Sequence, residues 1–174
     1  MVPRRTCDFE ENMSNPTGYS ASQIWLHWLV ALLIVPQFLL NEPMGQAWRA
    51  IERGQEISPS VLITAHVVVG FSILALVLWR LVLRMTRGAP PPPAEEAPAL
   101  KLVGKITHGL LYLVLALLVV SGGMAWFAGV KASAGVHEVM TSLLLVLVGL
   151  HVLGALYHQF VLKTNLIARM KRPG

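Results

Sequence analysis

Four long apolar stretches constrain the fold of this chain more than any other feature of its sequence. They occupy about residues 24–40, 61–83, 106–128 and 135–162. A helix needs about 20 mostly apolar residues to cross a hydrocarbon core about 30 Å thick, and the last three stretches reach that length. The first is shorter and contains Pro36, a residue that membrane helices tolerate. Because 55% of the residues are hydrophobic and only 13% are charged, we predict an all-α, integral membrane four-helix bundle, with residues 1–174 forming a single membrane domain.

The basic residues are distributed unevenly between the connections, which predicts the orientation in the membrane. Eleven of the 14 Lys and Arg residues, including Arg4 and Arg5, fall in the two tails and in the connection between the second and third stretches. The other two connections contain only Arg49, Arg53 and Lys131. Since cytoplasmic segments are enriched in Lys and Arg, we predict a multi-pass membrane protein with both termini cytoplasmic. We interpret the basic tails as contacts for anionic lipid, not for nucleic acid.

The connections and the single cysteine narrow the possible chemistry. "GAPPPPAEEAPA" (88–99) cannot be helical throughout, so we predict a stiff cytoplasmic linker. Residues 41–60 are expected to hold a short amphipathic helix on the periplasmic face, with Trp48 at the interface. We expect the first apolar helix to be retained, because no A-x-A-like cleavage site follows it. Cys7 is the only cysteine, so neither a disulfide nor a paired thiolate metal site can form within the chain.

Six histidines lie within or at the ends of the apolar stretches: His27, His66, His108, His137, His151 and His158. Ionisable side chains are costly in a membrane helix and usually face the interior of the bundle, where they serve a function. A single histidine near a helix end can instead bond a neighbour or lie among headgroups. The spacing of the whole set favours the functional interpretation.

Two histidines in the last stretch, His137 and His151, are 14 residues apart. On a helix they differ in direction by only about 40° and in height by about 21 Å. One helix therefore presents an imidazole near each membrane surface. His66 matches the depth of His137 and His27 matches that of His151, so we predict the pairs His66/His137 and His27/His151. His158 would lie about 10 Å further along and is the alternative to His151.

The ligand set indicates haem. Two imidazoles at each site, without carboxylate or thiolate ligands, disfavour structural zinc, which takes four protein ligands. A haem iron accepts axial histidines and takes its other ligands from the porphyrin. Because the C-x-x-C-H attachment motif is absent, we predict two b-type haems. Gly70 and the pair Gly122–Gly123 would let a macrocycle approach the backbone, or they serve helix packing.

Four segments carry a resemblance to a known family: "QIWLHWLVALL", "AHVVVGFSILALVLWRLVLR", "THGLLYLVLALLVVSG" and "VHEVMTSLLLVLVGLHVLGALYHQFVLKTNLIARM". Over about Ser20 to Met170 the chain resembles the bacterial cytochrome b561 family, of the superoxide:ubiquinone oxidoreductase type. The resemblance implies a bundle of the bacterial inner membrane in which the first, second and fourth helices hold two b haems. It also implies an oxidoreductase that passes electrons from a periplasmic donor, superoxide or a redox protein, to membrane quinone, with ubiquinone expected as the acceptor.

Several assignments keep alternatives. His108 and Arg80 are candidates for holding haem propionates or for acting behind a ligand, although His108 could exchange protons near a quinone and Arg80 could anchor its helix. His158 could also lie near a quinone. The basic residues of the periplasmic connections could steer an anion or only be solvated. The connection "GVKASAG" is short for the family, which puts contacts by that loop in doubt, and no catalytic residue is assigned.

Two other functional classes compete with this interpretation. The chain could be the haem-bearing membrane anchor subunit of a larger periplasmic dehydrogenase or reductase complex, with no activity of its own. It could also be a haem-free transporter or scaffold, which would give a colourless preparation.

Overall fold

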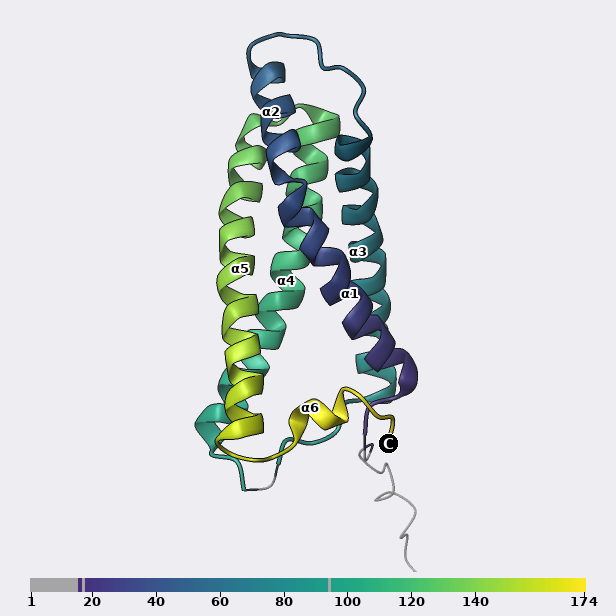
Figure 1. Ribbon diagram of the computed structural model, residues 1–174, viewed down its shortest axis with the longest axis vertical. Coiled ribbons are helices and arrows are strands. Elements are labelled where there is room, and N and C mark those ends of the chain that lie inside the picture. Colours follow the sequence, from purple (N-terminus) through teal and green to yellow (C-terminus); the bar gives the residue numbers. More distant parts are fainter. Residues whose placement is uncertain (1–15, 17, 94) are drawn as a thin grey trace, which may run out of the picture.

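The computed structural model describes residues 16, 18–93 and 95–174, and Arg4, Arg5 and Cys7 lie outside them. Across that part of the chain every regular element is a helix (Figure 1). Four helices are long and apolar enough to cross a membrane: α1 (Ala21–Leu39), α3 (Val61–Arg87), α4 (Pro98–Ala128) and α5 (Lys131–Phe160). The prediction of an all-α fold with four membrane helices is confirmed.

A capping box explains why α1 begins at Ala21, before the apolar stretch. The Ser20 hydroxyl accepts a hydrogen bond from the Gln23 amide at 3.3 Å, and the Gln23 side-chain oxygen accepts one from the Ser20 amide at 3.0 Å. Nε2 of Gln23 also donates to the Gly88 carbonyl at 3.0 Å, which ties the start of α1 to the end of α3. Pro36 lies inside α1 and does not end it, in keeping with the tolerance of membrane helices for proline.

α4 and α5 begin earlier than their apolar stretches, at Pro98 and Lys131 in place of residues 106 and 135. Hydropathy marks the part of a helix that lies in hydrocarbon, whereas the helix itself can continue through polar residues toward the headgroups. Pro98 suits a first turn because its φ is already helical and its missing N–H would have no helical partner there. The Pro-rich linker therefore ends at Ala97, which caps α4.

The long helices pack as two pairs, α1 with α3 and α4 with α5, and α3 joins the pairs through α4. α1 crosses the bundle diagonally in Figure 1 and, among the described residues, its backbone does not approach that of α5 closely, so the two helices meet only through side chains. One apolar cluster takes side chains from all four helices: Val30, Ile73, Val77, Val114, Leu115, Leu118, Leu144 and Leu147. Outward-facing side chains such as Leu32 (67% exposed) and Phe127 (68%) remain uncovered, as expected where lipid is the solvent.

α2 (Asn41–Glu52) lies at the end of the bundle where α3 starts, called here the α2 end (Figure 1). It is the short amphipathic helix expected within residues 41–60. Its Ala47 is buried, while Glu42 and Arg49 form an exposed ion pair at 3.2 Å. Trp48 is half-buried, consistent with one apolar and one polar face on this helix.

The opposite end, called here the α6 end, holds the start of α1, the end of α5, the short helix α6 (Leu166–Arg169) and the C-terminus. Three hydrogen bonds tie the C-terminal tail across it: Trp28 Nε1 to the Met170 carbonyl (2.7 Å), Arg169 Nη1 to the Pro91 carbonyl (2.8 Å) and the Gly174 amide to the Tyr19 carbonyl (3.4 Å). The start of α1 and the C-terminus therefore meet at one end. Their cytoplasmic location stays a prediction.

Candidate haem sites

At the α2 end, α3 and α5 bring His66 and His137 together. Their ring centroids are 6.3 Å apart and the rings are inclined at 62°. Nδ1 of His137 lies 2.8 Å from the carbonyl oxygen of Leu118 on α4. Because a carbonyl can only accept, Nδ1 carries the proton and Nε2 keeps the lone pair that a metal requires.

His66 is held less completely than His137. Nδ1 of His66 is buried and has no hydrogen-bond partner within the described part of the chain. The backbone carbonyl of His66 accepts a hydrogen bond from Nε2 of Gln37 on α1 at 3.2 Å. A buried polar atom without a partner is uncommon in a finished structure, so this ring is a site where a further group is expected.

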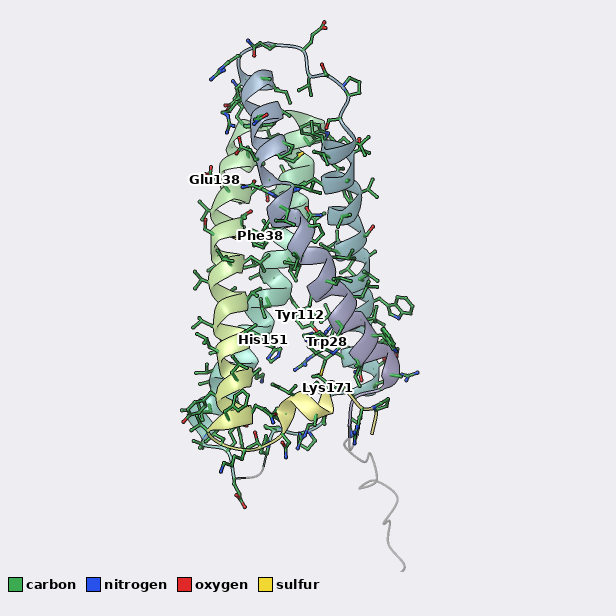
Figure 2. The ribbon with its side chains drawn as sticks, in the orientation of Figure 1. Trp28, Phe38, Tyr112, Glu138, His151 and Lys171 are labelled. Carbon is green, nitrogen blue, oxygen red and sulfur yellow. The ribbon has the colours of Figure 1, made fainter. Side chains whose placement is uncertain are left out.

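At the α6 end three histidines converge. The rings of His27 on α1 and His151 on α5 are 6.0 Å apart and inclined at 71°. His108 on α4 is closer to His151, at 5.0 Å, and its Nδ1 donates to the Gly104 carbonyl at 2.6 Å. Figure 2 shows His151 directed from α5 into the bundle, whereas Glu138 of the same helix points outward.

The separations within the two predicted pairs fit axial ligation of a haem iron. A metal–nitrogen bond of about 2 Å on each side, plus a ring radius of about 1 Å, places two axial imidazole centroids about 6 Å apart. Both pairs match this value, while the 5.0 Å between His108 and His151 is too short. Among the described residues no group of three or more His, Cys, Asp or Glu could hold a metal ion. A haem iron takes its remaining ligands from the porphyrin, so two histidines of the protein are sufficient at each site.

The helix pairing explains how each site is assembled. Each histidine pair takes one ring from the α1/α3 half of the bundle and one from the α4/α5 half. A cofactor bound by both rings of a pair would therefore connect the two halves of the bundle at that end.

Arg80 and Tyr112 add charge and polarity to the α6 end, and sequence reasoning missed the tyrosine. Nε of Arg80 donates to the Tyr112 hydroxyl at 3.0 Å. The guanidinium lies within electrostatic reach of His27, His108 and His151. Tyr112 follows His108 by one helical turn, and this i, i+4 spacing was the available signal that both share a face of α4.

His158 is drawn into a different cluster. Its Nε2 lies 3.2 Å from Oε1 of Glu96 in the Pro-rich linker, and the Glu96 side chain is only 5% exposed. The Thr164 hydroxyl donates to the backbone carbonyl of His158 at 3.3 Å. The Thr164 hydroxyl oxygen also lies 3.2 Å from Nδ1 of the His158 ring. Both ring nitrogens are thus engaged, and the geometry favours His151 over His158 as the partner of His27. Sequence reasoning did not identify Glu96.

The glycines differ from one another in what they accommodate. A methyl group built on Gly122 would meet the imidazole of His137, and one built on Gly123 would lie 3.6 Å from the edge of the Phe71 ring. A methyl group built on Gly70 would meet no atom within 4 Å. The interpretation that a macrocycle presses on Gly122 therefore changes, because a histidine ring occupies that position.

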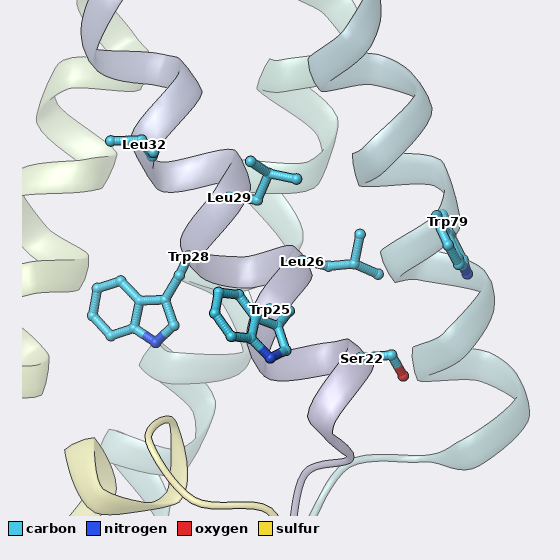
Figure 3. Close-up of a pocket in the computed structure, with 7 residues that line it drawn as sticks. All are labelled: Ser22, Trp25, Leu26, Trp28, Leu29, Leu32 and Trp79. Carbon is cyan, nitrogen blue, oxygen red and sulfur yellow. The ribbon is translucent and has the colours of Figure 1, made fainter.

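An apolar pocket of about 330 Å³ lies on the outer side of α1 (Figure 3). It is lined by Ser22, Trp25, Leu26, Trp28, Leu29, Leu32 and Trp79. The ring of Trp28 also contacts that of His27, with centroids 5.2 Å apart. With one hydroxyl among apolar side chains, this surface suits hydrocarbon, as expected for tryptophans of an interfacial belt.

The four-helix membrane fold and the paired histidines define a class of protein, the membrane cytochromes b. A family model described as prokaryotic cytochrome b561 matches residues 18–173, and the chain belongs to that family. Membership makes it an electron-transport protein of the membrane that uses b-type haem.

Three relatives align over most of their length. Cytochrome b562 of Cereibacter sphaeroides is 36% identical over 162 residues, which cover 92% of this chain and 99% of that protein. The probable superoxide oxidase CybB of Yersinia pestis is 26% identical, covering 87% and 94%. Cytochrome b561 homolog 1 of Escherichia coli is 25% identical, covering 87% and 96%.

Proposed function

We propose that this chain is a di-haem electron-transfer protein that carries electrons across the membrane, from a donor at the α2 end to a membrane quinone. The observation that carries the proposal is the presence of one histidine pair of axial spacing at each end of the bundle. His66 and His137 would hold one b haem, and His27 and His151 the other. A bound haem supplies reversible one-electron chemistry at its iron.

The residues between the two pairs support transfer along the bundle. His137 and His151 lie on one continuous helix, which separates them by about 21 Å. The apolar cluster that includes Val114, Leu118 and Leu144 closes the interior between them. Such packing excludes water and keeps the two sites at fixed positions along the bundle.

Arg80 would bind the propionate groups of the haem at the α6 end. Its bond to Tyr112 fixes the direction of the guanidinium, and an arginine binds carboxylates with two parallel hydrogen bonds. The described residues place no Asp or Glu in an ion pair with it. A cation inside a membrane bundle requires a compensating anion, and haem propionates are the anions that this site would offer.

His158 and Glu96 would supply protons to a quinone at the α6 end. Nε2 of His158 faces the Glu96 carboxylate and Nδ1 faces the Thr164 hydroxyl, so the three groups form a polar chain along which a proton would move. A quinone that takes up two electrons also takes up two protons. This chain of polar groups supports the proposed reduction of ubiquinone near the end of α5.

Superoxide is the proposed donor, in line with the printed name of the Yersinia relative. Each superoxide would give up one electron and leave as dioxygen, so two are needed for each quinone. Arg49 is already in an ion pair with Glu42, which leaves the exposed Arg53 and Lys131 to attract an anion to the α2 end.

The first test is the haem content of the purified chain and of four single variants. Pyridine haemochrome analysis should give two b haems for the native chain and one after His27→Ala, His66→Ala, His137→Ala or His151→Ala. His158→Ala is the matched control and should keep both. Loss of haem in His158→Ala with an unaffected His151→Ala would refute the assignment of the pairs.

A second measurement separates an enzyme from an anchor subunit. The isolated chain in detergent should be reduced by superoxide and should pass electrons to ubiquinone. A chain that holds two haems but reacts only after addition of a periplasmic redox partner would instead be the membrane anchor of a larger complex.

A further inference from the structure

One turn of α4, Leu118 to Gly122, is shaped around the ring of His137. The Leu118 carbonyl accepts the Nδ1 proton at 2.8 Å. A methyl group built on Gly122 would lie 2.9 Å from Nδ1 and 3.0 Å from Cε1 of the same ring. Non-bonded carbon atoms prefer separations of about 3.5–4.0 Å, so no side chain larger than hydrogen fits there while the ring keeps its position.

The same turn contains a buried serine. Oγ of Ser121 donates to the Leu117 carbonyl at 2.6 Å and also lies 3.2 Å from the Leu118 carbonyl. Serine hydroxyls that bond back to carbonyls in this way bend helices slightly. The Ser121 hydroxyl thus shares the Leu118 carbonyl oxygen with Nδ1 of His137, although its shorter bond goes to Leu117.

We infer that Gly122 and the Leu118 carbonyl are positioning groups for His137, which select its tautomer and fix the direction of its Nε2. This inference rests on the proposed role of His137 as an axial ligand. The carbonyl takes the proton from Nδ1, so Nε2 is the nitrogen left to bind iron. The glycine lets the ring lie against the backbone, which prevents the ring from turning away.

The contact is specific to this histidine. Gly123, next in sequence, has only Phe71 in front of it, at an ordinary contact distance. His108 has a carbonyl partner on its own helix, Gly104, but a methyl built on Gly104 or Gly109 would meet nothing within 4 Å. Only at His137, among the described histidines, do a carbonyl and a glycine of a second helix meet one ring.

The test compares two neighbouring glycines. Gly122→Ala should displace the His137 ring, so the α2-end haem should be lost or should show altered ligation in its electron paramagnetic resonance signal. The α6-end haem should keep the native signal and serve as the internal control for folding. Gly123→Ala should keep both signals, because its methyl meets only the edge of Phe71.

The outcomes separate this inference from the proposed function. A native α2-end signal in Gly122→Ala, together with loss of that haem in His137→Ala, would overturn the positioning role and leave the ligand assignment intact. An unchanged haem content in His137→Ala would refute the ligand assignment itself.

A measurement on the unmodified sequence covers the case in which Gly122→Ala does not assemble. In the reduced, diamagnetic protein, with histidine labelled by ¹⁵N, the Nδ1–H of His137 should exchange slowly with solvent. Its ring should also show a nuclear Overhauser contact with the α-protons of Gly122. A fast-exchanging proton, or a ring without that contact, would overturn the inference.

Discussion

The two ends of the bundle hold their histidines by different means. At the α2 end, His137 is fixed by an uncharged carbonyl and by contact with a glycine, and His66 has a buried nitrogen without a partner in the described part of the chain. At the α6 end, Arg80 lies among the histidines, and a histidine–carboxylate pair lies near the end of α5. The α2-end histidines thus lie beside uncharged groups, whereas those of the α6 end lie beside a cation and near a histidine–carboxylate pair.

This difference indicates a direction for the electrons. A nearby cation favours the reduced form of a redox centre, because reduction lowers the positive charge of the centre. Arg80 should therefore raise the reduction potential at the α6 end relative to the α2 end. Electrons entering at the α2 end would then move toward the α6 end, where we propose that the quinone is reduced.

The largest expected effect concerns protons at the α6 end. Glu96→Gln removes the carboxylate beside His158, and general acid–base groups contribute about 10²-fold or more to rates. Quinone reduction should slow by about 10²-fold, while reduction of the haems by the donor stays unchanged. Stopped-flow spectroscopy of the two steps measures both.

Glu95→Gln is the matched control for that variant, since Glu95 is the adjacent but exposed carboxylate. Equal slowing in both variants would mean that linker charge matters and the buried pair does not. That result would contradict the proposal that the two ends differ in their supply of protons to a quinone.

The next largest effect concerns the charge of Arg80. Arg80→Gln should lower the potential of the α6-end haem by about 60 mV, which is tenfold in the equilibrium of a one-electron couple. The α2-end potential should change little. A spectroelectrochemical titration resolves the two haem potentials. The control is Arg87→Gln, which removes an exposed charge on the same helix and should leave both potentials unchanged.

A smaller effect is expected from the hydroxyl that orients Arg80. Tyr112→Phe removes the hydrogen bond to Nε, and a bond of this kind contributes about 0.5–1.5 kcal/mol. The α6-end potential should fall, but by less than in Arg80→Gln. A fall of equal size in the double variant and in Arg80→Gln would show that the tyrosine acts only through the arginine.

The smallest effect is expected at the α2 end. Ser121→Ala removes a donor near the Leu118 carbonyl, so this oxygen should accept more strongly from His137. A stronger bond makes the imidazole a better electron donor and should lower the α2-end potential by about 10–20 mV, a fraction of a tenfold step. The control is Ser72→Ala, on the exposed side of α3, which should leave the α2-end potential unchanged.

Much of the arrangement was predictable because it depends on helix geometry alone. Depth and phase along α5 were sufficient to expect His137 and His151 at opposite ends, and the structure brings His66 and His27 to them. Glu96 was missed because the Pro-rich linker was interpreted as a spacer, whereas its carboxylate packs against α5. The match of Gly122 to His137 depends on how α4 packs on α5, which no local pattern encodes.

The separation of α1 from α5 has a consequence for biogenesis. Each half of the bundle has its own helix–helix contact, but within the described residues the backbones of the two halves approach each other closely only at α3 and α4. A chain synthesised under iron limitation should therefore insert as two loosely hinged units. Cofactor capture would then lock them together, so that resistance to membrane proteases reports maturation.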